Sequence, residues 1–185
     1  MMYSTATLEE KEGGTHMETS DAYSDLYLRS YATLVGQIFV VTTDRSEAEE
    51  AVQEAFVRLW VRWQQIAQYE NPEAWVRRVA LNIAIKRWRR NQRGEQLVKV
   101  VVRALVNETA KSDDRLDLQV ALRALPISHR HALLLHYVVG LSVQEITDEM
   151  STPLHRVKSG TVKSWLHRGR AQLSAALSSE EDINE

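Results

Sequence analysis

A cluster of cations between Asn71 and Arg93 contains the residue types best suited to bind another molecule. This segment holds seven Lys or Arg side chains and a single acid, Glu73. Because one acid cannot pair with seven cations, ion pairs along a helix do not account for the pattern. A basic stripe that also carries an amide and an aromatic ring is typical of a surface that follows a nucleic-acid backbone. We therefore expect the segment to bind nucleic acid; a solvated helix face is the simpler alternative.

The same segment has the signals of an amphipathic helix. Asn71 can cap the helix, and Pro72 suits its first position because its φ is fixed and it lacks a backbone donor. Apolar side chains recur on one side at the helical period and should be buried. The polar side chains expected on the opposite side are Arg78, Asn82, Lys86, Arg89, Arg90 and Arg93. Trp75 falls among them by its angle around the helix.

The composition allows one domain or two small ones and excludes several classes of protein. The chain has 185 residues, 44% of them hydrophobic, with three prolines and seven glycines, which argues against disorder. It has no cysteine, so we expect neither disulfides nor a thiolate metal site, as in a reducing cytoplasm. No apolar run approaches the roughly 20 residues that span a membrane, and no signal peptide begins the chain. We expect a cytoplasmic protein without membrane insertion.

Charge is segregated along the chain. The formal net charge is only -2. Residues 1–25 carry six acids and one lysine, and the tail after Leu177 adds four acids, so the basic segments are stronger than the total indicates. A chain with this balance would bind free DNA weakly, so we expect a partner to hold it on DNA.

The N-terminal part is expected to form an all-α domain over residues 21–93, after a disordered tail over residues 1–20. Aromatic and aliphatic side chains recur at helical spacing from Asp21 to Val41. Ser46 and Glu49 have the spacing of a capping box that would open a second helix. The outer face of this second helix, ending near Trp60, is acidic and rich in amides.

Residues 94–114 should link this domain to a second one, although they are not typical of a linker. An apolar stripe recurs at helical spacing. It comprises Leu97, Val98, Val101, Val102 and Leu105. Because several of these residues are valines, the segment could form a helix, a strand, or a surface that docks on a partner.

A second helical domain is expected over residues 115–178, followed by an acidic tail over residues 179–185. Pro126 should end one helix, and Gly140 should close the next. Ser142 and Glu145 form a capping box that opens a short helix. A basic helix follows, with exposed Lys163, Ser164, His167, Arg168 and Arg170. A short helix, a turn and a basic helix are the order of a helix-turn-helix, although an ordinary helical hairpin has the same outline.

Four motifs in this order resemble those of bacterial RNA polymerase sigma factors of the extracytoplasmic-function (ECF) class. They are A-E-E-A-V-Q-E-A-F-V-R-L-W, A-W-V-R-R-V-A-L-N with its basic run, A-L-R-A-L-P-I-S-H-R, and G-T-V-K-S-W-L-H-R-G-R. The resemblance covers residues 23–93 and 115–177. It implies an all-α fold of two small helical domains joined by a linker, the second with a helix-turn-helix. The function it implies is recognition of promoters for core RNA polymerase.

The resemblance also implies roles for particular residues. Glu50, Gln53 and Glu54 would contact core RNA polymerase. The helix Pro72–Arg93 and the loop before it would bind the minus-ten element as melted single strand. Asn82 would contact a base there, while Arg78, Lys86, Arg89 and Arg90 would hold phosphates. In the second domain, Lys163, Ser164, His167 and Arg168 would meet the minus-thirty-five duplex, with Arg170 on its backbone. An anti-sigma factor is an expected partner, and no cofactor or metal is expected.

The sequence departs from the family in three places. Its linker is apolar, Trp165 replaces a residue that is usually basic, and the connection Ser151–Ser159 is about five residues longer than the usual short turn. The connection contains Val157-Lys158-Ser159, which repeats five residues later as Val162-Lys163-Ser164. If both copies belonged to one helix, they would be rotated by about 140° from each other, and Gly160 would lie in the interior of that helix. We therefore expect the insertion to stay outside the recognition helix, which should begin at Gly160 or Thr161.

Two other classes of function fit the sequence less well. An enzyme is not expected, because no glycine-rich phosphate loop or catalytic triad is present, and His129 and His131 would lie on different sides of a helix. The main rival is a stand-alone helix-turn-helix regulator with a helical sensor domain, which would bind intact duplex by itself. The near-neutral charge and the acidic helix ending near Trp60 favour the polymerase-dependent interpretation.

Overall fold

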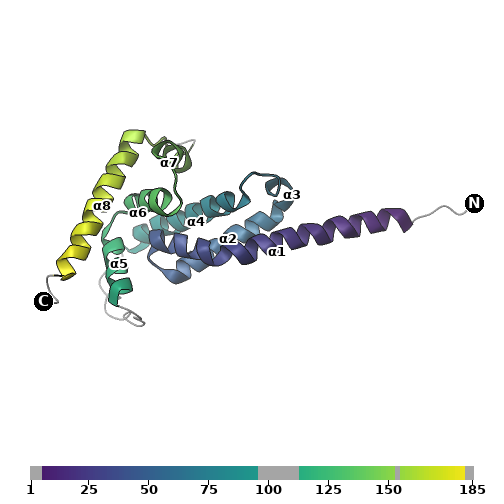
Figure 1. Cartoon of the computed structure of the whole chain (residues 1–185), viewed down its shortest axis with the longest axis horizontal. Helices are drawn as coiled ribbons and strands as arrows, with labels where there is room; N and C mark the ends of the chain where they lie inside the picture. The colour runs from purple at the N-terminus through teal and green to yellow at the C-terminus, as the bar shows by residue number, and fades with distance from the viewer. Residues whose placement is uncertain (1–5, 96–112, 153–154, 182–185) are drawn as a thin grey trace, which may run out of the picture.

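The computed structural model of the chain describes the backbone of residues 6–95, 113–152 and 155–181 (Figure 1). Within these ranges the regular secondary structure is helical, and two residues, Thr152 and His155, form an isolated β-bridge. The predicted all-α fold is confirmed. The apolar stripe of the predicted linker lies outside the described residues.

The N-terminal domain, residues 6–95, is built from three long helices and one short one. They are α1 (Ala6–Thr42), α2 (Arg45–Val61), α3 (Trp63–Ile66) and α4 (Pro72–Glu95). The long helices α1, α2 and α4 pack against one another in pairs. Their facing sides bury apolar residues that recur at helical spacing, such as Val52, Phe56 and Leu59 on α2. This packing fixes which side of α4 faces outward.

Two predictions for this domain are wrong. Residues 6–20 were expected to belong to a disordered tail, but they form the first turns of α1. Once a helix is nucleated by its packed part, each added residue gains a hydrogen bond without a new nucleation cost. In addition, Ser46 does not cap α2. The cap is Asp44, whose side chain accepts a hydrogen bond from the Glu47 amide at 3.1 Å.

The C-terminal domain, residues 113–181, follows a chain of short helices into one long helix. Its elements are α5 (Asp113–Ala124), α6 (Ile127–Leu133), a π-helical segment η1 (Leu134–Val138), α7 (Val143–Met150) and α8 (Ser159–Glu181). The predicted helix before Gly140 is thus an α-helix that widens into a π-helical turn. The helix-turn-helix consists of α7 and α8, which pack against each other.

The predicted ends of these helices agree with the structure. Gly140 follows η1 with φ of 85°, a left-handed conformation that glycine adopts without strain. Ser142 and Glu145 form the predicted capping box, with the Ser142 amide donating to the Glu145 carboxylate at 2.8 Å. These two signals place the start of α7 correctly.

The insertion stays outside the recognition helix, as predicted. The Thr152 amide donates to the His155 carbonyl at 2.8 Å, and the His155 amide donates back at 3.1 Å. Residues 155–158 are not helical, and Val157 is buried in the core. The helix α8 begins at Ser159, one residue before the predicted Gly160.

The two domains pack against each other, which the sequence did not indicate. The helix α1 contacts α5, α6 and η1 of the C-terminal domain (Figure 1). The buried apolar side chains of both domains form one continuous cluster, which runs from Leu26 in α1 to Leu166 in α8.

Candidate nucleic-acid interface

The helix α4 presents the predicted contacts on one exposed face. The Asn71 side chain accepts a hydrogen bond from the Ala74 amide at 2.9 Å, so the predicted cap is confirmed. On the opposite face, Val76, Ala80 and Leu81 are buried. The side chains of the exposed face that line a common cleft are Arg78, Asn82, Lys86, Arg89 and Arg90. Arg93 lies where side chains are not described.

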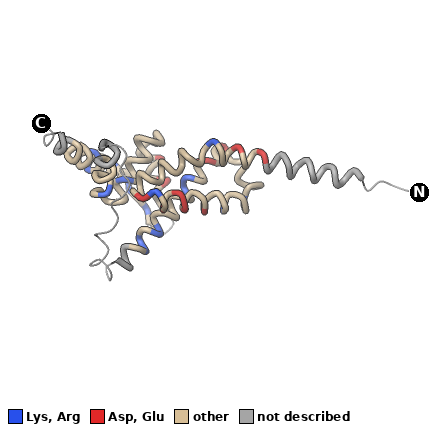
Figure 2. The backbone as a smooth tube through the Cα atoms, turned by 90° about the horizontal axis from the view of Figure 1, so that it is seen from below, with Lys and Arg blue, Asp and Glu red and all other residues tan. Residues whose placement is uncertain are grey.

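This face keeps most of its charge unpaired. Within the described part of the chain, Lys86, Arg89 and Arg90 form no ion pair, whereas Arg78 lies 3.7 Å from Glu149. Figure 2 shows that Lys and Arg positions gather mostly at the end of the molecule away from the N-terminus. A face with three unpaired cations is suited to bind phosphates.

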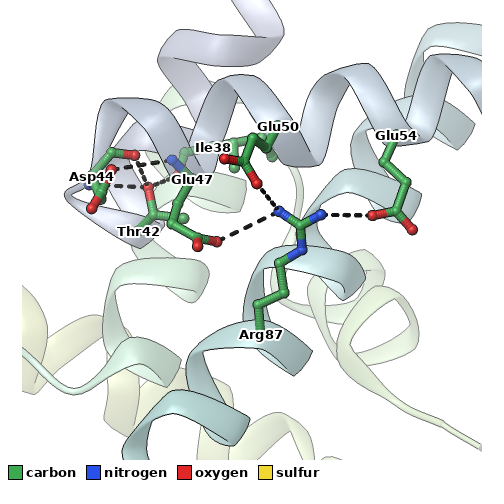
Figure 3. Close-up of polar contacts among 7 residues, drawn as sticks. All are labelled: Ile38, Thr42, Asp44, Glu47, Glu50, Glu54 and Arg87. Carbon is green, nitrogen blue, oxygen red and sulfur yellow. Dashed lines mark hydrogen bonds and ion pairs between the residues drawn. The ribbon is translucent and has the colours of Figure 1, made fainter.

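Two cations of α4 do not belong to this face. Arg77 is buried, and burial lowers the pKa of its guanidinium, although Glu149 and Glu73 oppose the shift. Arg87 points to α2, where three glutamates surround it (Figure 3). The count of seven cations in the sequence therefore overstated the charge available to a ligand.

The Arg87 guanidinium joins α4 to α2. One of its nitrogens lies 2.8 Å from Glu50, and the other lies 2.8 Å from Glu54 (Figure 3). Glu47 is farther away, at 3.8 Å. Burial disfavours the charged guanidinium, but the three carboxylates outweigh that cost and raise the pKa of Arg87. The cluster is a structural contact that sequence reasoning missed, because Glu50 and Glu54 lie more than thirty residues before Arg87 in the sequence.

The predicted polymerase-contacting residues lie beside this cluster. Glu50 keeps 58% of its side chain exposed and Glu54 keeps 35%. Gln53 is exposed, and its amide donates to the Tyr31 hydroxyl at 3.3 Å. These three side chains remain on the surface of α2, but two of them already hold Arg87.

The recognition helix α8 separates its faces as predicted except at Ser164, which was expected to be exposed. Val162 and Leu166 are buried, and Gly169 packs so closely on α6 that a Cβ there would lie 2.9 Å from Leu133. Ser164 is half-buried. The side chains of the predicted set that are exposed are Lys163, His167, Arg168 and Arg170.

A cleft of about 820 Å³ lies between the two domains. The exposed face of α4 lines one side of it. The other side is formed by α6, the end of α7, the insertion and Trp165 of α8. Trp165, the residue that departs from the family, thus faces the cleft, and it packs against the core. Trp75 also packs against the core, although its angle around α4 places it among the polar side chains.

The described residues hold no group of three or more His, Asp or Glu side chains that could bind a metal ion. None of the helices in the same ranges is both long enough and apolar enough to cross a membrane.

Comparison with known proteins identifies both domains. The model of sigma-70 region 2 matches residues 25–94, and that of sigma-70 region 4 matches residues 115–173. Two regions of this kind, joined in one helical chain, define a transcription initiation factor. The chain belongs to the sigma-70 family, as an RNA polymerase sigma factor of the ECF class.

Individual relatives agree with this assignment. The ECF RNA polymerase sigma factor SigE of Mycolicibacterium smegmatis is 34% identical over 158 residues, which cover 80% of this chain and 59% of that relative. The RNA polymerase sigma-E factor of Streptomyces avermitilis is 30% identical over 158 residues, which cover 85% of this chain and 82% of that relative. The solved structure of the sigma factor RpoE with the anti-sigma factor NepR from Bartonella quintana has a TM-score of 0.68. It covers 85% of this chain and 97% of its own, and at 22% identity it shows the fold alone.

Proposed function

We propose that the chain binds core RNA polymerase and directs it to promoters through two DNA-binding surfaces. The observation that carries this proposal is the exposed face of α4, where Asn82 lies in one cleft with three cations that form no ion pair to the described residues. These cations are Lys86, Arg89 and Arg90. We assign minus-ten recognition to residues 21–93 and minus-thirty-five recognition to residues 115–178. The segment 94–114 would join them.

At the minus-ten element, α4 would bind a melted strand. Extruding a base costs a few kcal/mol, which contacts to the free base and to the backbone can offset. Asn82 has an amide that can donate to and accept from a base edge. Arg78, Lys86, Arg89 and Arg90 would hold phosphates on both sides of it.

At the minus-thirty-five element, α8 would enter the major groove of intact duplex. Lys163, Ser164, His167 and Arg168 would approach the bases, and Arg170 would contact the backbone. All but Ser164 are exposed. Ser164 is half-buried, so its contact would be limited to what its hydroxyl can reach.

The surface of α2 that carries Glu50, Gln53 and Glu54 would dock on core RNA polymerase. The close contacts to Arg87 fix two of these side chains in place before docking. Ordering them in advance reduces the entropy lost on binding. We infer that the chain works in the cytoplasm, has no catalytic activity of its own, and has an anti-sigma factor as a further partner.

Reconstitution with core RNA polymerase tests this function. The purified chain should comigrate with the core enzyme and direct transcription from a defined start site. A variant in which Gln53 and Glu54 are replaced by Ala should keep its fold and bind the core enzyme less tightly. If the chain alone binds a symmetric duplex site as a dimer and gives no transcription with the core enzyme, the stand-alone regulator is correct instead.

A further inference from the structure

The turn between α1 and α2 is held by three side chains of the C-terminal domain. Thr43, the central residue of the turn, has φ of 56°. Its carbonyl accepts hydrogen bonds from Gln119 at 2.9 Å and from Arg123 at 3.3 Å. Its hydroxyl accepts one from Arg130 at 3.1 Å. A single residue of the N-terminal domain therefore receives three donors from α5 and α6.

Arg130 shows that this contact is part of a closed interface. Only 4% of the residue is exposed, and burial together with Arg123 lowers the pKa of its guanidinium. Its Nε has no hydrogen-bond partner in the described structure. A buried guanidinium with an incomplete set of partners is costly, so this part of the interface relies on its geometry and on the surrounding apolar packing.

The same packing places the C-terminal domain opposite the nucleic-acid face of α4. Arg78 lies 3.7 Å from Glu149 at the end of α7, across the cleft. Glu149 keeps only 17% of its side chain exposed. Burial raises the pKa of this carboxyl group, with Arg78 and Arg77 opposing the shift. A melted strand that followed α4 would have to share the cleft with α6, α7 and Trp165.

This closed arrangement does not match the spacing of a promoter. Elements near minus ten and minus thirty-five are about 25 base pairs apart, or roughly 85 Å along a duplex. Here a side chain of α4 and one of α7 lie within ion-pair distance. Residues 96–112 could span about 60 Å if extended, so the chain length permits the domains to separate.

We propose that the contact of Gln119, Arg123 and Arg130 with Thr43 is a latch that keeps the free protein closed, with the C-terminal domain over the DNA-binding face of α4. The consequence for DNA rests on the proposed function, whereas the latch itself does not. Opening the latch would expose α4 and allow the two domains to reach both promoter elements. Binding of the chain to core RNA polymerase would then be coupled to this opening.

Two variants on α5 test the latch. Gln119→Ala removes one donor to the Thr43 carbonyl, and alanine favours the helix more than glutamine does, so the fold should survive. Arg123→Ala removes the other donor. The matched controls are Gln144→Ala, which loses a local contact to Asp148, and Arg156→Ala, which is exposed.

Two measurements are made on each full-length variant. Because the chain has no cysteine, a pair of labels can be placed at Ala32→Cys on α1 and Ala171→Cys on α8, both exposed, outside the assigned contact residues and on different domains, to measure the distance between domains. Binding of a fluorescent oligothymidylate measures access to α4. We expect both latch variants to lengthen the label distance and to bind the oligonucleotide about three- to tenfold more tightly, as for one hydrogen bond lost from the closed state.

The Arg123→Ala variant separates the latch from simple electrostatics. Removing a cation should weaken DNA binding by charge alone, so tighter binding supports the latch. Longer label distances without tighter binding would support the latch and count against α4 as the DNA-binding face. Unchanged distances and affinities in both variants, relative to their controls, would overturn the latch.

Discussion

The cluster around Arg87 leads to a stability prediction that can be worked out from the structure. Replacing Arg87 with Met keeps most of the aliphatic stem but removes both 2.8 Å contacts to α2. Hydrogen bonds between charged groups contribute about 1.5–3 kcal/mol each when buried. Glu50 is 58% exposed and Glu54 is 35% exposed, so solvent screening reduces this contribution. The three glutamates would also repel one another once the cation is gone.

We therefore expect Arg87→Met to lower the free energy of unfolding by about 1–2 kcal/mol, or the melting temperature by roughly 3–6 °C. Urea and thermal unfolding followed by circular dichroism measure both quantities. Arg90→Met is the matched control, because Arg90 is exposed and forms no ion pair in the described structure. Its effect should stay within about 0.5 kcal/mol.

Salt and a second substitution sharpen this test. In 1 M salt, where the Debye length is about 3 Å, the difference between the two variants should shrink. A double-mutant cycle with Glu54→Gln should give a coupling energy of at least about 0.5 kcal/mol. If Arg87→Met is no more destabilising than Arg90→Met, and the cycle shows no coupling, the cluster does not hold α2 and α4 together.

Three further predictions follow from other sites. Gly169→Ala should destabilise the protein by about 1–3 kcal/mol in urea unfolding, because its Cβ would meet Leu133, whereas Gly160→Ala, with nothing within 4 Å, should stabilise it slightly. Burial lowers the pKa of His131 to about 4, so stability should be lost as pH falls from about 6.5 towards 4, and His131→Leu should remove about 2 kcal/mol of this loss near pH 5. In the holoenzyme, Arg89→Ala should weaken binding to all promoters alike, and should reduce by about one the slope of log binding constant against log salt concentration. Asn82→Ala should instead relax the base preference at one minus-ten position by about 1–3 kcal/mol. Equal effects of the last two changes on every promoter would refute the division of roles.

Local signals in the sequence predicted much of the fold. Asn71, Gly140 and the capping box at Ser142 act through neighbouring backbone groups, so their effect can be inferred from a few residues. The rotation argument for the insertion also depends only on helix geometry, and the structure agrees with it. The prediction that Ser46 caps α2 was wrong because Asp44 and Ser46 are both suited to cap a helix. The left-handed turn at Thr43 lets α2 start at Arg45, so Asp44 is the cap.

Long-range polar contacts could not be predicted in the same way. Arg87 follows the periodicity of the basic face, yet its partners lie on another helix. Gln119 and Arg123 are polar residues of α5 whose acceptor is a backbone carbonyl 76 and 80 residues away. Hydrophobic periodicity says which face of a helix is buried, but it does not say which polar side chains meet between domains.

The contact at Thr43 has a further consequence because both domains belong to one chain. Residues 96–112 keep the domains tethered, and a tether of this length gives an effective concentration on the order of millimolar. A few hydrogen bonds around Thr43 and a shared apolar cluster can therefore hold the domains together, although the same two surfaces on separate molecules at micromolar concentration would seldom meet. Cutting the tether, with every contact left intact, would be enough to release the basic face of α4.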